Sequence, residues 1–361
     1  MAIPVKGALM DRRHFLKAAG VTYLTALSSA RAETLIRTDA VYASAFRAAD
    51  GSFGAALLSE EGVVVSEVAL PGRAHGLASS ADKVVAFARR PGTFAFVFDR
   101  QNRANPIIIN SPADRHFYGH GHFSPDGRIL YASENDFDGN RGMIGLYDAT
   151  DGFRRIGEFS AYGLGTHDMG VSDDGRLLII ANGGIETHPD FGRTKLNVDH
   201  MEPSLVLADA KTGDLIEKHP LPAELRQLST RHIDVDGAGR IWFACQYQGP
   251  RDDLPPLVGH FALGDDLHWV KLPDDVTLGM ANYVGAIAVN RRDGLVGIAS
   301  PVGGMTVSFE AATGKVVAKT PLKEAAGIAP ALHGFATSTY DGRFQQRHSE
   351  VNWDQHIIRI A

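Results

Sequence analysis

The sequence predicts an all-β protein that folds as one β-propeller, with seven blades of four-stranded antiparallel sheets. Three observations lead to this prediction. A histidine-led unit recurs along the chain with a spacing of roughly 45 residues, which is typical of propeller blades. Each unit holds short apolar runs of strand length, rich in β-branched residues. Long segments with a 3.6-residue period are nearly absent, so helices should be few. Six or eight blades stay open as alternatives.

The recurring unit is a histidine, a short strand, a polar turn with a glycine, a second strand, a loop, a third strand and a fourth. It is clearest in YGHGHFSPDGRILYAS at 118–133, THDMGVSDDGRLLIIA at 166–181 and TRHIDVDGAGRIWFAC at 230–245. Runs such as Ser124-Pro125-Asp126-Gly127 are turn sequences and need no functional explanation. Six innermost strands are clear. The last unit lacks a strand, so strands from the N-terminal unit should help to close the ring and leave no free edge.

The first 32 residues are expected to lie outside the fold. Arg12 and Arg13 precede Phe15-Leu16-Lys17, a modest apolar stretch and the small-x-small sequence Ala30-Arg31-Ala32. This pattern predicts a cleaved twin-arginine export signal at 1–32, a propeller at 33–361 and a periplasmic location. The alternative is a basic patch that precedes a helix.

Composition excludes several classes of protein. The net charge of −6, which becomes −10 without residues 1–32, argues against a binder of nucleic acids or anionic membranes. No later run of 18 apolar residues occurs, so we expect no membrane span. Cys245 is the single cysteine, so no internal disulfide can form. Motifs for a nucleophilic serine, covalent haem attachment or a phosphate-binding loop are absent. The residues therefore identify no catalytic group, and a monomeric non-enzyme is the preferred interpretation.

The repeated histidines form the candidate metal site. Because innermost strands all begin at the same mouth of a propeller channel, histidines at the same repeat position should converge there. The sixth unit has Asn282 and Tyr283 instead. Imidazole nitrogens would suit Cu, Zn or Fe as ligands. Asp168 or Asp234 would hydrogen-bond to the other ring nitrogen of a histidine and fix its tautomer. Alternatively, the histidines join neighbouring blades by hydrogen bonds. The predicted ligands are His75, His120, His167, His232 and His333.

Three elaborated loops should open on the same face as these histidines. The longest spans 182–204, and shorter ones hold Glu134, Asp136 and Arg141 or lie near the C-terminus, at 348–356. Arg193 and Lys195 would suit an anionic ligand. The alternative is that the 182–204 loop packs over the channel as a lid. The residues predicted to bind a cofactor or ligand are His188, Asp190, Arg193, Lys195, His200, Trp353 and His356.

The stretch GGIETHPDFGRTKLNVDHMEPSL at 183–205, NWDQH at 352–356, the signal and the repeats together resemble the domain-of-unknown-function 1513 family. These are periplasmic β-propellers related to YVTN and WD-repeat proteins. The resemblance implies genes beside imelysin-type and di-haem peroxidase-like proteins, which would be partners in iron or other metal uptake. It favours a binding or accessory protein for a metal or metal chelate. A metal-dependent or redox enzyme and a protein-interaction scaffold stay open as alternatives.

Overall fold

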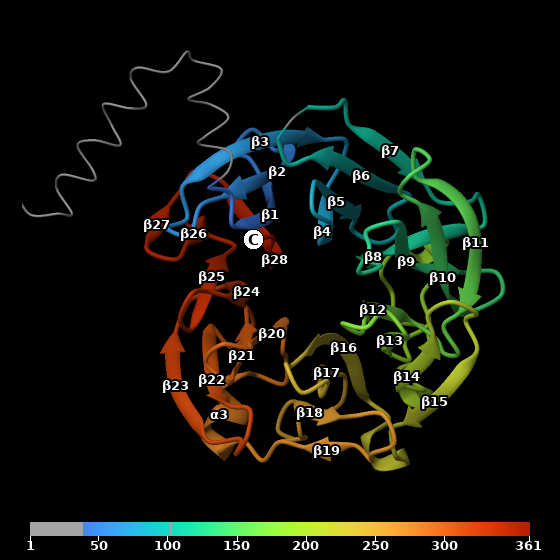
Figure 1. Cartoon of the computed structure of the whole chain (residues 1–361). Coiled ribbons are helices and arrows are strands. Elements are labelled where there is room, and N and C mark those ends of the chain that lie inside the picture. The colour runs from blue at the N-terminus through green and yellow to red at the C-terminus, as the bar shows by residue number, and fades with distance from the viewer. Residues whose placement is uncertain (1–38, 102) are drawn as a thin grey trace, which may run out of the picture.

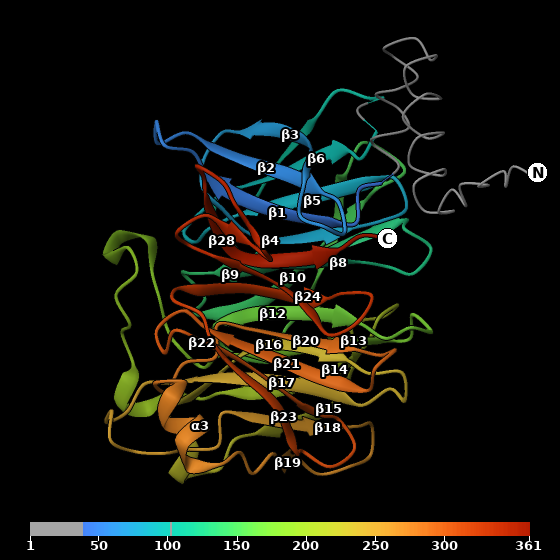
Figure 2. The ribbon, with the colours of Figure 1, turned by 90° about the vertical axis from the view of Figure 1, so that its left-hand side faces the viewer.

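The structure is a computed structural model that describes residues 39–101 and 103–361. Seven four-stranded antiparallel sheets stand around a central channel (Figure 1). The predicted all-β propeller with seven blades is therefore confirmed. Figure 2 shows the blades edge-on, with the short helix α3 (Asp274–Gly279) at one face of the ring. The predicted export signal lies outside the described residues.

The innermost strands line the channel and contact one another around the ring. They are β4 (Ala74–Ser79), β8 (Arg115–Phe123), β12 (Thr166–Val171), β16 (Leu228–Val235), β20 (Ala286–Asn290), β24 (Ala325–Pro330) and β28 (Asn352–Arg359).

The second strand of each blade pairs with the innermost one. These strands are β1 (Tyr42–Arg47), β5 (Lys83–Ala88), β9 (Ile129–Asp136), β13 (Leu177–Asn182), β17 (Ile241–Tyr247), β21 (Leu295–Ser300) and β25 (Phe335–Thr339). The third strands are β2 (Phe53–Leu58), β6 (Phe94–Asp99), β10 (Arg141–Asp148), β14 (Ser204–Asp209), β18 (Val258–Phe261), β22 (Met305–Glu310) and β26 (Arg343–Phe344).

The outermost strands complete the blades, and short helical turns occur in the connections. The outer strands are β3 (Val64–Leu70), β7 (Ile107–Asn110), β11 (Arg154–Ser160), β15 (Leu215–Pro220), β19 (His268–Trp269), β23 (Val316–Pro321) and β27 (Arg347–His348). The turns are η1 (Pro189–Phe191), η2 (Val198–His200) and η3 (Ala223–Leu225). No helix in the described part of the chain is long and apolar enough to cross a membrane.

The ring closes between the two ends of the described chain. Strand β28 is the innermost strand of the blade that β1, β2 and β3 complete, so one sheet joins residues 42–70 to residues 352–359. The predicted closure by N-terminal strands is thus confirmed. Backbone hydrogen bonds between β1 and β28 satisfy polar groups that an open edge would expose.

Burial explains the sequence pattern of the strands. Middle strands lie between two neighbouring blades and are buried on both faces, so β13 reads as an almost continuous apolar run. Outer strands face solvent on one side, so β11 alternates between exposed and half-buried residues. Aromatic pairs such as Phe87 with Phe117, whose ring centres are 5.9 Å apart, pack one blade against the next.

The repeated polar turns share the same hydrogen bonds as well as a similar sequence. Ser124 Oγ donates to Asp126 at 2.6 Å and accepts from the Ile129 N–H at 3.0 Å. The equivalent Ser172 makes the same two bonds, to Asp174 and from the Leu177 N–H, at the same distances. This chemistry fixes the turn between the first two strands of each of these blades.

Candidate functional site

Five histidines from five innermost strands form one cluster inside the channel. One ring nitrogen from each of His75, His120, His167 and His232 lies within 4.8 Å of those of the other three, and these four side chains are buried. The ring of His356, from β28, lies 4.7 Å from His75, 4.7 Å from His120 and 4.8 Å from His232, measured between ring centres. We call these five residues the histidine layer.

Irregular strand pairing coincides with every histidine of the layer. Between β12 and β13 the register shifts across His167, and between β16 and β17 it shifts just before His232. Similar shifts span His75 in β4, His120 in β8 and the stretch of β28 that ends at His356. A β-bulge changes the direction of the side chains beside it. Strand β20 pairs without a bulge and contributes no histidine.

Two glycines allow the rings of neighbouring strands to approach. Gly119 has φ of 104°, and a Cβ on it would lie 2.8 Å from the ring of His75. A Cβ on Gly76 would lie 2.8 Å from Nδ1 of His120. Larger residues at either position would push His75 and His120 apart, so both glycines are needed for close packing of the layer.

Hydrogen bonds hold part of the layer and leave other ring nitrogens without partners. Asp168 Oδ1 lies 3.3 Å from Nδ1 of His120, and Arg231 donates to Nδ1 of His167 at 3.1 Å. The Nε2 atoms of His167 and His232 are 3.2 Å apart, close enough for one to donate to the other. By contrast, Nδ1 of His75 and Nε2 of His120 and His356 are buried with no partner. Such atoms are costly to bury unless something else binds them.

Four histidines of the layer, His75, His167, His232 and His356, are held neutral. Burial, followed by the charge of neighbouring rings and arginines, lowers the pKa of His75, His167 and His356 well below its ordinary value. The same causes lower the pKa of His232 to about 3. Neutral imidazoles have a free lone pair, so these four rings present nitrogen donors rather than cations.

The expectation that His333 belongs to this cluster is wrong. His333 lies in the turn between β24 and β25, its side chain is 71% exposed, and its Nδ1 is 3.2 Å from Asp293. The sequence HGFATSTYDGRF looks like the start of a blade, but the innermost strand of that blade is β24, which precedes it and has no histidine. The place predicted for His333 belongs to His356, which was predicted as a ligand-binding residue.

A cationic cavity of about 250 Å³ lies on one side of the layer and ends on His75 and His167. Tyr283, which follows α3, also lines it, so this cavity opens on the face that carries α3. No acidic residue lines it in the described part of the chain. We call it the cationic chamber, and its charged lining residues are Arg89, Arg90, Arg193, Lys195 and Arg231.

A second cavity, of about 360 Å³, lies on the other side and ends on His120, His232 and His356. Its wall is largely apolar, and the charged residues that line it are Asp168, Asp173, Asp234, Arg291 and Arg359. Asp168 also accepts from the Ile233 N–H at 3.1 Å, and Asp234 accepts from the Val289 N–H at 2.7 Å. Asp168 thus contacts a histidine of the layer as expected. Asp234 accepts from the backbone N–H groups of Val235 and Val289 and contacts no histidine of the layer.

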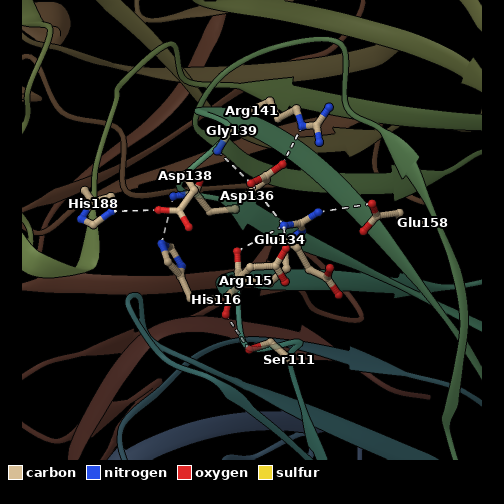
Figure 3. Close-up of polar contacts among 12 residues, drawn as sticks. Ser111, Arg115, His116, Glu134, Asp136, Asp138, Gly139, Arg141, Glu158 and His188 are labelled. Atoms are coloured by element: carbon tan, nitrogen blue, oxygen red, sulfur yellow. Dashed lines mark hydrogen bonds and ion pairs between the residues drawn. The ribbon is translucent and has the colours of Figure 1, made fainter.

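The long loop contributes some predicted residues to the cavity and holds others away from it. Arg193 and Lys195 line the cationic chamber, and Lys195 Nζ donates to Gln248. His188 packs against Phe137 with ring centres 5.2 Å apart, beside Asp138 (Figure 3). Asp190 and His200 are exposed. Neither cavity is lined by His188, Asp190 or His200.

The other polar residues of the elaborated loops have structural contacts. Asp136 binds Arg141 at 2.6 Å and Arg115 at 3.2 Å (Figure 3), and Glu134 is buried beside Tyr147 and Arg155. Trp353, predicted to bind a ligand, is buried between Phe46 and Phe344 and lines neither cavity.

Comparison with known proteins identifies the family. The family model described as "protein of unknown function (DUF1513)" matches residues 68–360. The chain belongs to this family. A curated relative, dihydro-heme d1 dehydrogenase of Pseudomonas aeruginosa, is 30% identical over 113 residues, which are 31% of this chain and 18% of that protein. The match thus spans less than a fifth of the relative's length.

Solved structures with a similar fold share little sequence with this chain. Hydrazine synthase of Kuenenia stuttgartiensis is 13% identical with a TM-score of 0.56, over 80% of this chain and 86% of that one. The β-propeller domain of Cps50 (Swd1) of Myceliophteria thermophila is 12% identical with a TM-score of 0.58, over 83% and 93%. At these identities the likeness concerns the fold alone.

Proposed function

We propose that this propeller binds a transition metal, as an ion or as a small chelate, at the histidine layer. The observation that carries the proposal is the set of buried ring nitrogens without partners on His75, His120 and His356. These atoms belong to imidazoles from three blades, packed with His167 and His232. Imidazole nitrogen is a good ligand for Cu, Zn and Fe and a poor one for Ca or Mg.

The contacts around His120 fit such a ligand. A carboxylate on one ring nitrogen fixes the tautomer and turns the lone pair of the other nitrogen toward the metal. Asp168 is on Nδ1 of His120, which leaves the unpartnered Nε2 for a ligand. Separations between ligand atoms of about 3.3 Å follow from tetrahedral bonds of about 2.0 Å. The separations within the layer, up to 4.8 Å, therefore require the rings to move inward slightly.

Size distinguishes between kinds of chelate. The name of the Pseudomonas aeruginosa relative concerns a haem, which is an iron chelate with carboxylate side chains. The cationic chamber, at about 250 Å³, is smaller than the roughly 300–1,000 Å³ of pockets for drug-sized ligands, whereas the second cavity, at about 360 Å³, lies at the lower end of that range. On the side of the cationic chamber the proposal therefore favours a bare ion or a small chelate over a macrocycle.

Calorimetric titration of the purified protein with Cu(II), Zn(II) and Fe(II) tests the proposal. His120→Gln with His232→Gln keeps side-chain volume and polarity but removes two donors, so metal affinity should fall at least about 100-fold. The matched control, His200→Ala with His333→Ala, removes two exposed histidines that lie outside the layer and should bind like the wild type. Equal binding by both double variants, or no binding by the wild type, would show that the layer is structural.

The proposal includes a periplasmic role in metal uptake, because the sequence of residues 1–32 resembles a twin-arginine signal. Imelysin-type and di-haem peroxidase-like proteins are then the expected partners. Replacing Arg12 and Arg13 by lysine should keep the protein in the cytoplasm, as followed by cell fractionation. Export that is unaffected by this change would remove the periplasmic part of the proposal and leave metal binding untouched.

A further inference from the structure

The cationic chamber holds more positive charge than the described chain neutralises. Arg89 contacts Asp354 at 3.2 Å, but Asp354 also binds Arg73 at 2.7 Å, so one carboxylate serves two guanidinium groups. Arg90 and Arg193 make no ion pair within residues 39–101 and 103–361. Positive charges without partners repel one another most strongly where water is scarce.

Arg231 is the most constrained of these groups. Its side chain is only 4% exposed, its Nη1 donates to His167, and its Nε is buried without a partner. Burial and the nearby arginines lower the pKa of Arg193 and Lys195. A buried guanidinium with a free N–H normally has an anion beside it.

Neutral donors complete the lining. The Tyr118 hydroxyl is buried without a partner, and Gln248 and Gln355 line the same cavity. Guanidinium groups bind carboxylate or phosphoryl oxygens with two parallel hydrogen bonds, and hydroxyl and amide groups can complete the shell of such an anion. The five cations come from different segments of the chain: Arg89 and Arg90 follow β5, Arg193 and Lys195 lie in the 182–204 loop, and Arg231 lies in β16.

We infer that the cationic chamber is a binding site for a small, multiply charged oxyanion, one that carries two or more carboxylate or phosphoryl groups. Cations spread over several segments match separated negative groups better than a single charge. The volume of about 250 Å³ limits the ligand to a small molecule. This site goes beyond the proposed metal binding, because its ligating groups are arginine, lysine, tyrosine and glutamine.

The position of the chamber couples the two sites. His75 and His167 belong both to the chamber lining and to the histidine layer. A metal ion in the layer would be repelled by Arg231, which contacts His167 directly. An anion in the chamber offsets that repulsion, so each ligand should tighten the binding of the other by the same factor.

Calorimetric titration of metal-free protein at low ionic strength tests the inference. The probes are citrate, pyrophosphate and acetate, and metal is removed with a chelating resin so that no competing anion is added. Citrate or pyrophosphate should bind saturably and acetate much more weakly. Binding of citrate alone identifies a carboxylate site, and binding of pyrophosphate alone a phosphoryl site. Absence of binding by both, or acetate as tight as either, overturns the inference.

Charge variants locate the site. Arg193 and Lys195 are exposed at the rim, so R193Q with K195Q should fold normally and lose at least about tenfold in anion affinity. The buried R231Q should lose as much. The matched control, R154Q with K211Q, removes the same two charges from exposed positions that line neither cavity and should change affinity less than twofold. If the rim and control variants lose equal anion affinity, the anion is attracted by net charge alone, and the proposed site is wrong. Metal plays no part in this titration, so its outcome is independent of metal binding.

Discussion

The two cavities that meet at the histidine layer differ in charge. On one side, Arg89, Arg90 and Arg231 gather with Arg193 and Lys195, and no acidic residue lines the wall in the described part of the chain. On the other side, Asp168, Asp173 and Asp234 share a largely apolar wall with Arg291 and Arg359. Two rings of the layer end the first cavity and the other three end the second, so the layer separates a strongly positive space from one of mixed charge.

The difference follows from position along the innermost strands. Arg231 and Gln355 precede a histidine of the layer by one residue and line the cationic chamber. Asp168, Ile233 and Ile357 follow a histidine by one residue and line the second cavity. Strand direction therefore assigns each neighbour of a histidine to one cavity. One ring of rigid strands can thus present unlike surfaces to two ligands.

The largest effect should come from acid, which acts on the layer itself. The pKa of His232 is about 3 in the folded protein and about 6.5 in an unfolded chain. Between these values the unfolded state binds more protons, so stability present above about pH 6.5 is lost as pH falls. We expect a loss of about 2 kcal/mol in the free energy of unfolding between pH 7 and pH 5 from His232 alone. The lowered pKa values of His75, His167 and His356 should add to it. Urea denaturation of the metal-free protein at both pH values measures this loss, which should be smaller in H232Q.

Asp168→Asn tests the second cavity and should have the next largest effect. The change weakens the contact with His120 and the bond from the Ile233 N–H. We expect the free energy of unfolding to fall by about 1–2 kcal/mol and metal affinity to fall about 10–100-fold. Citrate affinity without metal should stay within about twofold of the wild type. A larger loss of citrate than of metal binding would mean that the two cavities do not act separately.

Arg90→Met tests the cationic side through stability. Removing one of several like charges in a partly buried space should raise the free energy of unfolding by about 1 kcal/mol at low ionic strength. The gain should shrink as salt is added, because salt screens the repulsion that the variant removes. The control Arg154→Met affects an exposed arginine paired with Asp151 and should change stability by less than about 0.5 kcal/mol. Loss of stability in R90M at low salt would contradict repulsion within the chamber.

The smallest effect should come from His333→Ala, which removes a histidine outside the layer. Its ring is largely exposed and contacts Asp293 in a turn, so the free energy of unfolding should change by less than about 0.5 kcal/mol. Metal affinity should be unchanged in the same titration used for the layer. A clear loss of metal binding in this variant would show that the site extends to the opposite face.

The sequence predicted the propeller because each blade carries its own strand lengths and turn chemistry. Ser124-Pro125-Asp126-Gly127 and Ser172-Asp173-Asp174-Gly175 specify the same turn by local hydrogen bonds alone. Four histidines of the layer were predicted for the same reason, since they recur at one position of the repeat. His333 was misassigned because the residues around it resemble the start of a blade. The blade in fact begins with β24, which contains no histidine.

The cationic chamber could not be predicted as a unit. Its five charges come from three stretches of chain, and only the ring of blades brings them together. Arg193 and Lys195 stood out in a long polar loop, whereas Arg89 and Arg90 look like any charges at the end of a strand. Arg231 offered a signal that sequence reasoning missed. It directly precedes a histidine of the repeat, and the residues on either side of it in β16 are buried.

Closure of the ring by β28 has a consequence for synthesis of the protein. His356 reaches the layer only when β28 pairs with β1, and these strands stand at opposite ends of the series of blades in the chain. A ribosome that has completed six blades has therefore produced four imidazoles and an open channel. A ligand that needed the fifth imidazole would therefore bind only after β28 has closed the ring.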